Sequence, residues 1–321
     1  MKYNYKRLTI SEYIDELYKD GLKKSNLLTD KEIEQRVQNI GIFRLKGYIK
    51  AFRDGLSNYS FEDIFMLYDT DRYISSMMFG LSSQVEIKLK AYIIETVYSL
   101  SDNPFFYLLK DSYIEEFSLS SESIYDWKIK TNLYRRNSEI YLHYQEYYLK
   151  NYNFDVNKQE YLSSEILIID ESLDINYPPF HYFIENLTLG SLIKILSKLK
   201  IDDKIILKIV AKKFGFYNER VFLNYLLRLK ELRNRCAHNG RLFNRNYRGV
   251  KAFIKEHKKF RKVIYEHKLI DTYYTLCILL DKVEKFQNID ILVDSFKNDI
   301  LKQCNKKIED KIISIMMRKT R

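Results

Sequence analysis

The sequence contains few of the residues that form tight turns. Only nine Gly and three Pro occur among its 321 residues, and two of the prolines, Pro178 and Pro179, are adjacent. A protein with many strands needs turn residues at much shorter intervals. Hydrophobic residues make up 46% of the chain, which is ample for a core and excludes disorder as the main state. The composition therefore predicts an all-α globular fold.

Cysteine and long apolar runs are scarce as well. The three cysteines, Cys236, Cys277 and Cys304, are too far apart in sequence for a disulfide framework or a zinc site. Charged residues interrupt the hydrophobic runs long before the roughly 20 residues that a membrane span requires. The first residues, Met1–Arg7, lack the apolar core of a secretory signal. We expect a reduced cytoplasmic protein with no membrane association, no metal and no cofactor.

Positive charge, by contrast, is abundant and concentrated. The chain has 54 Lys and Arg against 43 Asp and Glu, a net charge of +11. The segment from Arg228 to Lys268 holds 14 of the basic residues and three of the acidic ones, so it alone carries +11 and the remainder is neutral. A basic face that serves only solubility would be scattered, whereas a concentrated one is typical of a surface that binds a polyanion. The charge pattern favours nucleic acid over a solvated basic face.

Start and stop signals predict helices in the first third of the chain. Thr29 and Glu32 form a capping box that begins one helix, and Gly41 ends it. Apolar residues at three- and four-residue steps predict a long helix over 60–100, with a break near Asp69 and Thr70. A polar, tyrosine-rich helix is expected over 121–150.

Further helices are expected after the hinge at Pro178 and Pro179. They fall near 180–186, 187–199 and 201–214, with Gly215 closing the third of them and Asn218 capping the next. No linker separates two domains clearly. We expect a compact multi-helix body over residues 1–250 and a basic, then mixed, helical C-terminal extension over residues 251–321 that packs on it.

The segment from Arg233 to Arg245 carries the candidate chemistry. On an ideal helix Asn234, His238 and Arg241 share one narrow stripe, and Arg233 lies about 140° round from His238. Imidazole shuttles protons near neutral pH and guanidinium binds phosphate with two hydrogen bonds, so the combination suits phosphodiester chemistry. An arbitrary Arg and His pair more often only caps a helix, and that alternative stays open. Asn239-Gly240 predicts the helix end, with Gly240 in the left-handed conformation.

The motif and its neighbours resemble a known family. Arg233, four further residues and His238, with Asn234 directly after the arginine, resembles the Arg-x4-6-His motif of HEPN-domain proteins. The residues from Leu232 to Arg245 are similar to the C-terminal signature of the Abi-like family, the AbiD/AbiF type of bacterial abortive-infection proteins. The element at 41–48 also resembles that family, and it departs from the family pattern at Phe43 and Lys46. The resemblance covers roughly residues 10–250.

The resemblance implies a HEPN-like helical bundle that acts as a metal-independent endoribonuclease. In such an enzyme the 2′-hydroxyl of RNA attacks the adjacent phosphorus and leaves a 2′,3′-cyclic phosphate and a 5′-hydroxyl. His238 would be the base or acid, Arg233 would stabilise the developing charge, and Asn234 would orient His238 or the phosphate. Because one chain offers a single such histidine, a homodimer is implied. DNA, which lacks the 2′-hydroxyl, would not be a substrate.

Two functions remain open for this segment. The first is a toxin-like ribonuclease in phage defence; the second is a non-catalytic protein that holds a structured small non-coding RNA, which serves as antitoxin or scaffold. Glu86 is expected either to pair with Arg233 or to form a structural salt bridge, and Asp71 with Arg72 to form a buried ion pair or to support the site. The further polar residues expected to bind RNA are Arg235, Asn239, Arg241, Asn244, Arg245 and Arg248.

Overall fold

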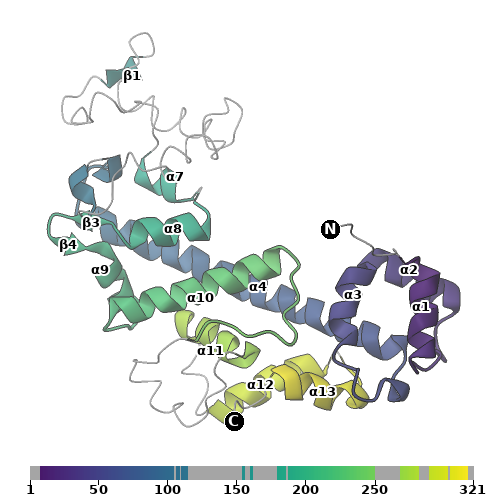
Figure 1. Cartoon of the computed structure of the whole chain (residues 1–321). Helices are drawn as coiled ribbons and strands as arrows, with labels where there is room; N and C mark the ends of the chain where they lie inside the picture. The colour runs from purple at the N-terminus through teal and green to yellow at the C-terminus, as the bar shows by residue number, and fades with distance from the viewer. Residues whose placement is uncertain are drawn as a thin grey trace, which may run out of the picture.

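The computed structural model describes residues 8–104, 106–108, 110–114, 154–155, 160–161, 179–185, 187–249, 268–281, 289–302 and 304–316. Helices predominate in these residues, which confirms the all-α fold (Figure 1). The strands in the described residues form two short antiparallel pairs, β1 (Phe154–Asp155) with β2 (Glu160–Tyr161) and β3 (Lys200–Ile201) with β4 (Lys204–Ile205). The helix expected over 121–150 lies outside the described residues. Within the described residues, no helix combines the length and the apolarity needed to cross a membrane.

Three short helices begin the fold: α1 (Ile10–Lys19), α2 (Asp30–Ile40) and α3 (Ile42–Ile49). The capping box of Thr29 with Glu32 is present at the start of α2, as predicted. Gly41 ends α2 with φ 85°, a left-handed value that glycine adopts without strain. A 3-10 turn, η1 (Leu56–Asn58), leads from this group of helices into the next one.

The long helix α4 (Phe61–Tyr98) spans 38 residues and is the axis on which the other elements pack. Its predicted start is confirmed, because Ser60 caps it together with Asp63. The predicted break near Asp69 and Thr70 is wrong, and the helix continues through both residues. Thr70 is buried here, and burial against neighbouring elements outweighs weak intrinsic helix propensity.

Short elements from both before and after Pro178 and Pro179 in the sequence cover one end of α4. They are η2 (Phe106–Leu108), η3 (Lys110–Ser112), α7 (Phe180–Glu185), α8 (Leu189–Leu196) and α9 (Ile206–Lys213). The helix expected over 201–214 begins later than predicted, because residues 200–205 form the β3–β4 hairpin instead. Asp202 turns this hairpin with φ 52°, a left-handed conformation that Asp tolerates better than most residues. Gly215 closes α9 with φ 79°, as predicted.

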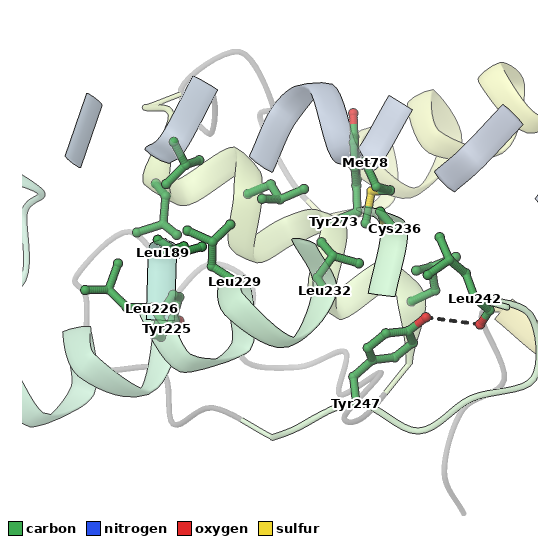
Figure 2. Packing of buried hydrophobic residues seen from close by; sticks show 14 of the residues in the cluster. Met78, Leu189, Tyr225, Leu226, Leu229, Leu232, Cys236, Leu242, Tyr247 and Tyr273 are labelled. Atoms are coloured by element: carbon green, nitrogen blue, oxygen red, sulfur yellow. Dashed lines mark hydrogen bonds between the residues drawn. The ribbon is translucent and has the colours of Figure 1, made fainter. Parts of the chain in front are cut away.

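The helix α10 (Glu219–Ala237) occupies the centre and packs against α4, α8, α9 and α11. Asn218 caps it as predicted, because its side-chain oxygen accepts from the backbone N–H of Arg220 at 2.9 Å and of Val221 at 3.2 Å. Figure 2 shows the apolar side of α10 within the core. The labelled core residues of the helices are Tyr225, Leu226, Leu229, Leu232 and Cys236 of α10, with Met78 of α4, Leu189 of α8 and Tyr273 of α11; Leu242 and Tyr247, also labelled, come from the loop after α10.

Helices of the C-terminal region share this core. They are α11 (Leu269–Leu279), α12 (Ile289–Leu301) and α13 (Lys306–Met316). Every residue of α11 except Asp271 is buried, and the helix packs on both α10 and α4. At the other end of α4, the ammonium of Lys311 lies 4.7 Å from the centre of the Phe52 ring. The division of the chain at residue 250 stays a prediction.

A buried ion pair joins α11 to α10. Arg228 is fully buried, and its guanidinium lies 2.6 Å from the carboxylate of Asp271. The same guanidinium donates to the hydroxyl of Thr275 at 3.1 Å and to the backbone carbonyl of Arg248. One of the 14 basic residues of the 228–268 segment is therefore internal. Its charge stabilises the packing of two helices and is not available to a ligand.

We expect Asp271→Ala to lower the free energy of unfolding by about 3 kcal/mol, because it leaves the buried guanidinium of Arg228 without its counter-ion. Urea unfolding monitored by circular dichroism measures this loss. Asp69→Ala is the matched control, since the carboxylate of Asp69 is exposed and pairs with Arg36 on the surface; its effect should be much smaller. Equal losses in the two variants would mean that the Arg228–Asp271 pair does not hold α11 in place.

Candidate active site

The last turn of α10 ends in a regular C-terminal cap. The backbone N–H of Asn239 donates to the carbonyl of Cys236 at 3.0 Å, and that of Gly240 donates to the carbonyl of Arg235 at 2.7 Å. This is the paired hydrogen-bond pattern of a Schellman motif. Asn239 takes the left-handed position with φ 52°, so the prediction that Gly240 occupies it is wrong. Asn is among the non-glycine residues that adopt this conformation most readily.

Gly240 is required at its position for a different reason. A Cβ atom there would lie 2.8 Å from Cγ of Arg235 and 3.1 Å from the Arg235 carbonyl oxygen. The chain after the cap therefore passes directly against the last turn of α10, and a larger residue would push the two apart. The carbonyl of Gly240 in turn accepts a hydrogen bond from Arg72 of α4 at 2.9 Å.

The three motif residues point in two directions. Asn234 and His238 are both exposed, one turn apart on the same side of α10. Arg233 is half-buried and faces α4, where its Nε lies 3.4 Å from a carboxylate oxygen of Glu86. Its guanidinium also lies 5.9 Å from the centre of the Phe79 ring. The pairing of Glu86 with Arg233, which the sequence left open, is present.

Arg241 does not share the stripe of Asn234 and His238. That prediction assumed that the helix continues, whereas α10 ends at Ala237 and the chain reverses after it. Arg241 instead donates a hydrogen bond to the backbone carbonyl of Gly47 in α3, and its guanidinium lies 5.9 Å from the Tyr48 ring. Burial, and then the nearby charge of Arg245, lower the pKa of Arg241. Its guanidinium ties the loop after α10 to α3.

The other residues expected to bind RNA differ in how far they reach solvent. Arg235 is half-buried, lies 3.3 Å from Glu231 and stacks 5.7 Å from the ring of Tyr247. The side chains that the structure places at the surface near the end of α10 are Asn239, Asn244, Arg245 and Arg248. The loop after α10 thus presents its free cations beyond the motif and not within it.

Asp71 of α4 lies beneath this loop and is fully buried. It accepts hydrogen bonds from the hydroxyl of Tyr48 at 2.6 Å and from Arg72 at 2.7 Å. It also accepts from the backbone N–H groups of Phe243 at 2.7 Å and Leu242 at 3.2 Å. Asp71 and Arg72 therefore form a buried ion pair and support the loop at once. Sequence reasoning singled out both residues but did not connect them to residues 240–243, which lie about 170 positions further along the chain.

The protonation states around Asp71 keep its neighbours as donors. Burial and the charge of Asp71 both raise the pKa of Tyr48, so its hydroxyl stays protonated. Burial works against the charge of Arg72, but the carboxylate of Asp71 outweighs it and the pKa of Arg72 is raised. Burial also raises the pKa of Cys236, which keeps the thiol neutral. Across the described residues, no three His, Cys, Asp or Glu side chains gather where a metal ion would fit.

Packing fixes the far end of the same loop. Leu242, Phe243 and Tyr247 are buried, and the Tyr247 hydroxyl donates to the Leu242 carbonyl at 3.1 Å (Figure 2). The ring of Phe243 stacks near that of Tyr48, with 6.4 Å between centres. The loop is thus part of the core on one side and exposed on the other.

Comparison with known proteins identifies one family. A family model described as "Abi-like protein" matches residues 35–244, well over half of the chain. No curated protein and no solved structure matches the chain. The matched region runs from α2 through α10 and includes both the motif and the α4 residues that support it. The chain belongs to the Abi-like protein family.

Proposed function

We propose that this protein acts in phage defence by binding RNA and cleaving it through a metal-independent, HEPN-type Arg/His site in a homodimer. Membership of the Abi-like family supports the role in abortive infection. The observation that carries the cleavage is the end of α10, where Asn234 and His238 are exposed on one side and Arg233, directly before Asn234, faces α4 and Glu86. The imidazole can transfer protons and the guanidinium can stabilise negative charge, which are the two requirements of phosphodiester cleavage.

The proposed reaction needs no group other than RNA and these side chains. The 2′-oxygen forms a bond to phosphorus as its proton passes to a base, and the bond from phosphorus to the 5′-oxygen breaks as that oxygen takes a proton from an acid. His238 supplies proton transfer, Arg233 stabilises the negative charge on the phosphoryl oxygens, and Asn234 orients the phosphate or His238. Glu86 holds the Arg233 guanidinium in one place, which limits the motion that binding would otherwise have to suppress.

A single histidine cannot be the base and the acid of the same step, so the reaction calls for a second chain. The exposed side of α4 next to Arg233 suits a second copy. Residues 73–85 of α4 contain no charged residue, and the side chains of Tyr73, Phe79 and Ile87 are 40%, 37% and 68% exposed. Because Phe79 contacts Arg233, two copies that meet on this side would bring their motifs together.

A second function is favoured by the basic loop. Arg245 and Arg248 are exposed beyond the motif, and they can hold phosphates whether or not His238 acts on the RNA. The protein would then grip a structured small non-coding RNA without cutting it. The same surface serves both functions, so only variants of His238 can distinguish RNA cleavage from RNA binding without cleavage.

We expect His238→Ala to reduce RNA cleavage by about 10²- to 10⁴-fold, the usual loss on removing a general acid or base. Its melting temperature should stay near that of the wild type, because the side chain is exposed and carries little packing. The assay is cleavage of labelled RNA in EDTA, with end-group analysis for a 2′,3′-cyclic phosphate and a 5′-hydroxyl.

Other outcomes of that assay contradict the mechanism. A requirement for Mg²⁺ or products with a 5′-phosphate would rule out transesterification by His238. Tight RNA binding by the wild type with no cleavage of any RNA would favour the non-catalytic function. Arg233→Lys is an intermediate variant, since it keeps a positive charge but loses the bidentate contact with the phosphate. It should cleave RNA far more slowly than the wild type.

We expect the double variant Arg245→Ala/Arg248→Ala to flatten the salt dependence of RNA binding. The slope is that of the logarithm of the binding constant against the logarithm of the salt concentration. On single-stranded RNA, its magnitude should fall by about 0.7 when one interaction with a phosphate is removed and by about 1.4 when two are removed. Filter binding between 50 and 200 mM salt measures the slope. Lys208→Ala/Lys212→Ala removes the same charge from exposed positions on α9 and is the matched control. An equal change in the control would show that net charge alone matters. Arg241→Ala should leave the slope nearly unchanged, because its guanidinium is bound to Gly47.

We expect Ile87→Glu to shift the protein from dimer to monomer in sedimentation velocity and to lower cleavage in parallel. A carboxylate placed at this exposed apolar position would be buried in the contact between the two chains. Phe43→Glu is the control, because Phe43 is 94% exposed on a different helix, α3. A wild-type protein that is monomeric while it cleaves RNA would refute the composite site.

A further inference from the structure

We infer that Asp71 is a positioning residue for the proposed site: its buried carboxylate holds the loop at Gly240–Phe243 and thereby the end of α10 that carries His238. This inference rests on the proposed function. Asp71 lies below the loop and is fully buried, so it does not meet RNA itself. Its role would be to set where the exposed residues point.

The carboxylate is shielded from water, so its charge has to be compensated by protein groups. A buried ionised carboxylate is costly unless it is paired and hydrogen-bonded. Among the described residues Asp71 receives hydrogen bonds from Tyr48, Arg72 and the backbone N–H groups of Leu242 and Phe243. Those donors come from α3, α4 and the loop. The single charge therefore joins α3 and α4 to a loop about 170 residues further along the chain.

A continuous set of hydrogen bonds leads from Asp71 to the motif. One guanidinium nitrogen of Arg72 donates both to Asp71 at 2.7 Å and to the carbonyl of Gly240 at 2.9 Å. The N–H of Gly240 donates in turn to the carbonyl of Arg235 at 2.7 Å. Arg235 lies in the last turn of α10, one turn before His238. The position of Gly240 is thus held from both sides, by α4 and by the helix end itself.

The tight reversal after His238 makes its orientation sensitive to this support. The chain turns within two residues, with Asn239 at φ 52° and Gly240 too close to Arg235 to accept a Cβ atom. A loop released from Asp71 would shift these residues and move His238 with them. Misplacement of a reacting group by about 1 Å can cost roughly 10²-fold in rate. The Asp71–Arg72 ion pair would therefore affect turnover more than RNA binding. The exposed cations of the loop would contribute to binding independently of it.

The test compares Asp71→Asn with Asp69→Asn. The amide of Asn has the shape of the carboxylate but turns one acceptor into a donor that faces Tyr48 and Arg72. Asp69 lies on the same helix, is exposed and pairs with Arg36, so its variant controls for loss of one negative charge. We expect kcat per folded molecule to fall roughly 10- to 100-fold in Asp71→Asn with KM within about threefold of the wild type. Asp69→Asn should behave as the wild type.

Tyr48→Phe serves as the second variant if Asp71→Asn does not fold, since it removes one hydroxyl and keeps the ring. Its control is Tyr68→Phe, a ring that packs edge-on against Tyr48. We expect a smaller loss of kcat in Tyr48→Phe and none in its control. Wild-type kcat per folded molecule in Asp71→Asn, or in Tyr48→Phe where that variant has to stand in, would overturn the inference.

Amide hydrogen exchange separates failure of this inference from failure of the proposed function. We expect the amides of Leu242 and Phe243 to exchange at least tenfold faster in the Asp71→Asn or Tyr48→Phe variant, while amides in the middle of α10 keep wild-type rates. Unchanged exchange at Leu242 and Phe243 would overturn the support of the loop whatever the activity. Faster exchange in a protein that cleaves no RNA would sustain that support but refute the proposed nuclease and, with it, the positioning role.

Discussion

The helix α10 has to satisfy two opposite demands. Its apolar side packs against α4, α8, α9 and α11, and this burial supplies much of the core. For the proposed function, its last turn has to leave Asn234 and His238 exposed, as they are. The chain meets both demands by ending the helix at Ala237 and reversing it at once, so that the next residues return to the core while the motif stays at the surface.

Charge compensation follows from the same constraint, because the part of the basic segment that lies in α10 and the loop after it, residues 228–249, packs on the core. Arg228 pairs with Asp271, Arg233 with Glu86 and Arg235 with Glu231, while Arg241 is bound by the carbonyl of Gly47. The excess charge that the sequence displays is therefore larger than the charge that this helix end offers to a ligand. Exposed cations lie further along, in the loop that carries Arg245 and Arg248. For the proposed function, this division supports separate roles for the two parts, with proton transfer and charge stabilisation at the motif and RNA binding in the loop.

Features that depend on neighbours in sequence could be predicted from it. The capping box at Thr29, the stop at Gly41 and the cap at Asn218 each involve residues within four positions, and all are present. Features that depend on distant contacts could not. α4 continues past Thr70 because its neighbours bury it, and Arg241 leaves the expected stripe for an acceptor 194 residues away. The sequence contains Asp71 but no sign that Leu242 and Phe243 would bind it.

The two directions of the motif bear on why the proposed site requires two chains. Arg233 faces α4 and Glu86, whereas His238 points out from the cap, so the guanidinium and the imidazole of one chain do not converge through the helix itself. A phosphate held by Arg233 would sit at the edge of α4, beside the uncharged residues 73–85. If a second copy covers that side, its own helix end reaches the same edge and can present a histidine to the phosphate. Under this arrangement Glu86 gains a further effect, because it compensates Arg233 until RNA arrives and lowers the repulsion between two cationic motifs as the chains meet.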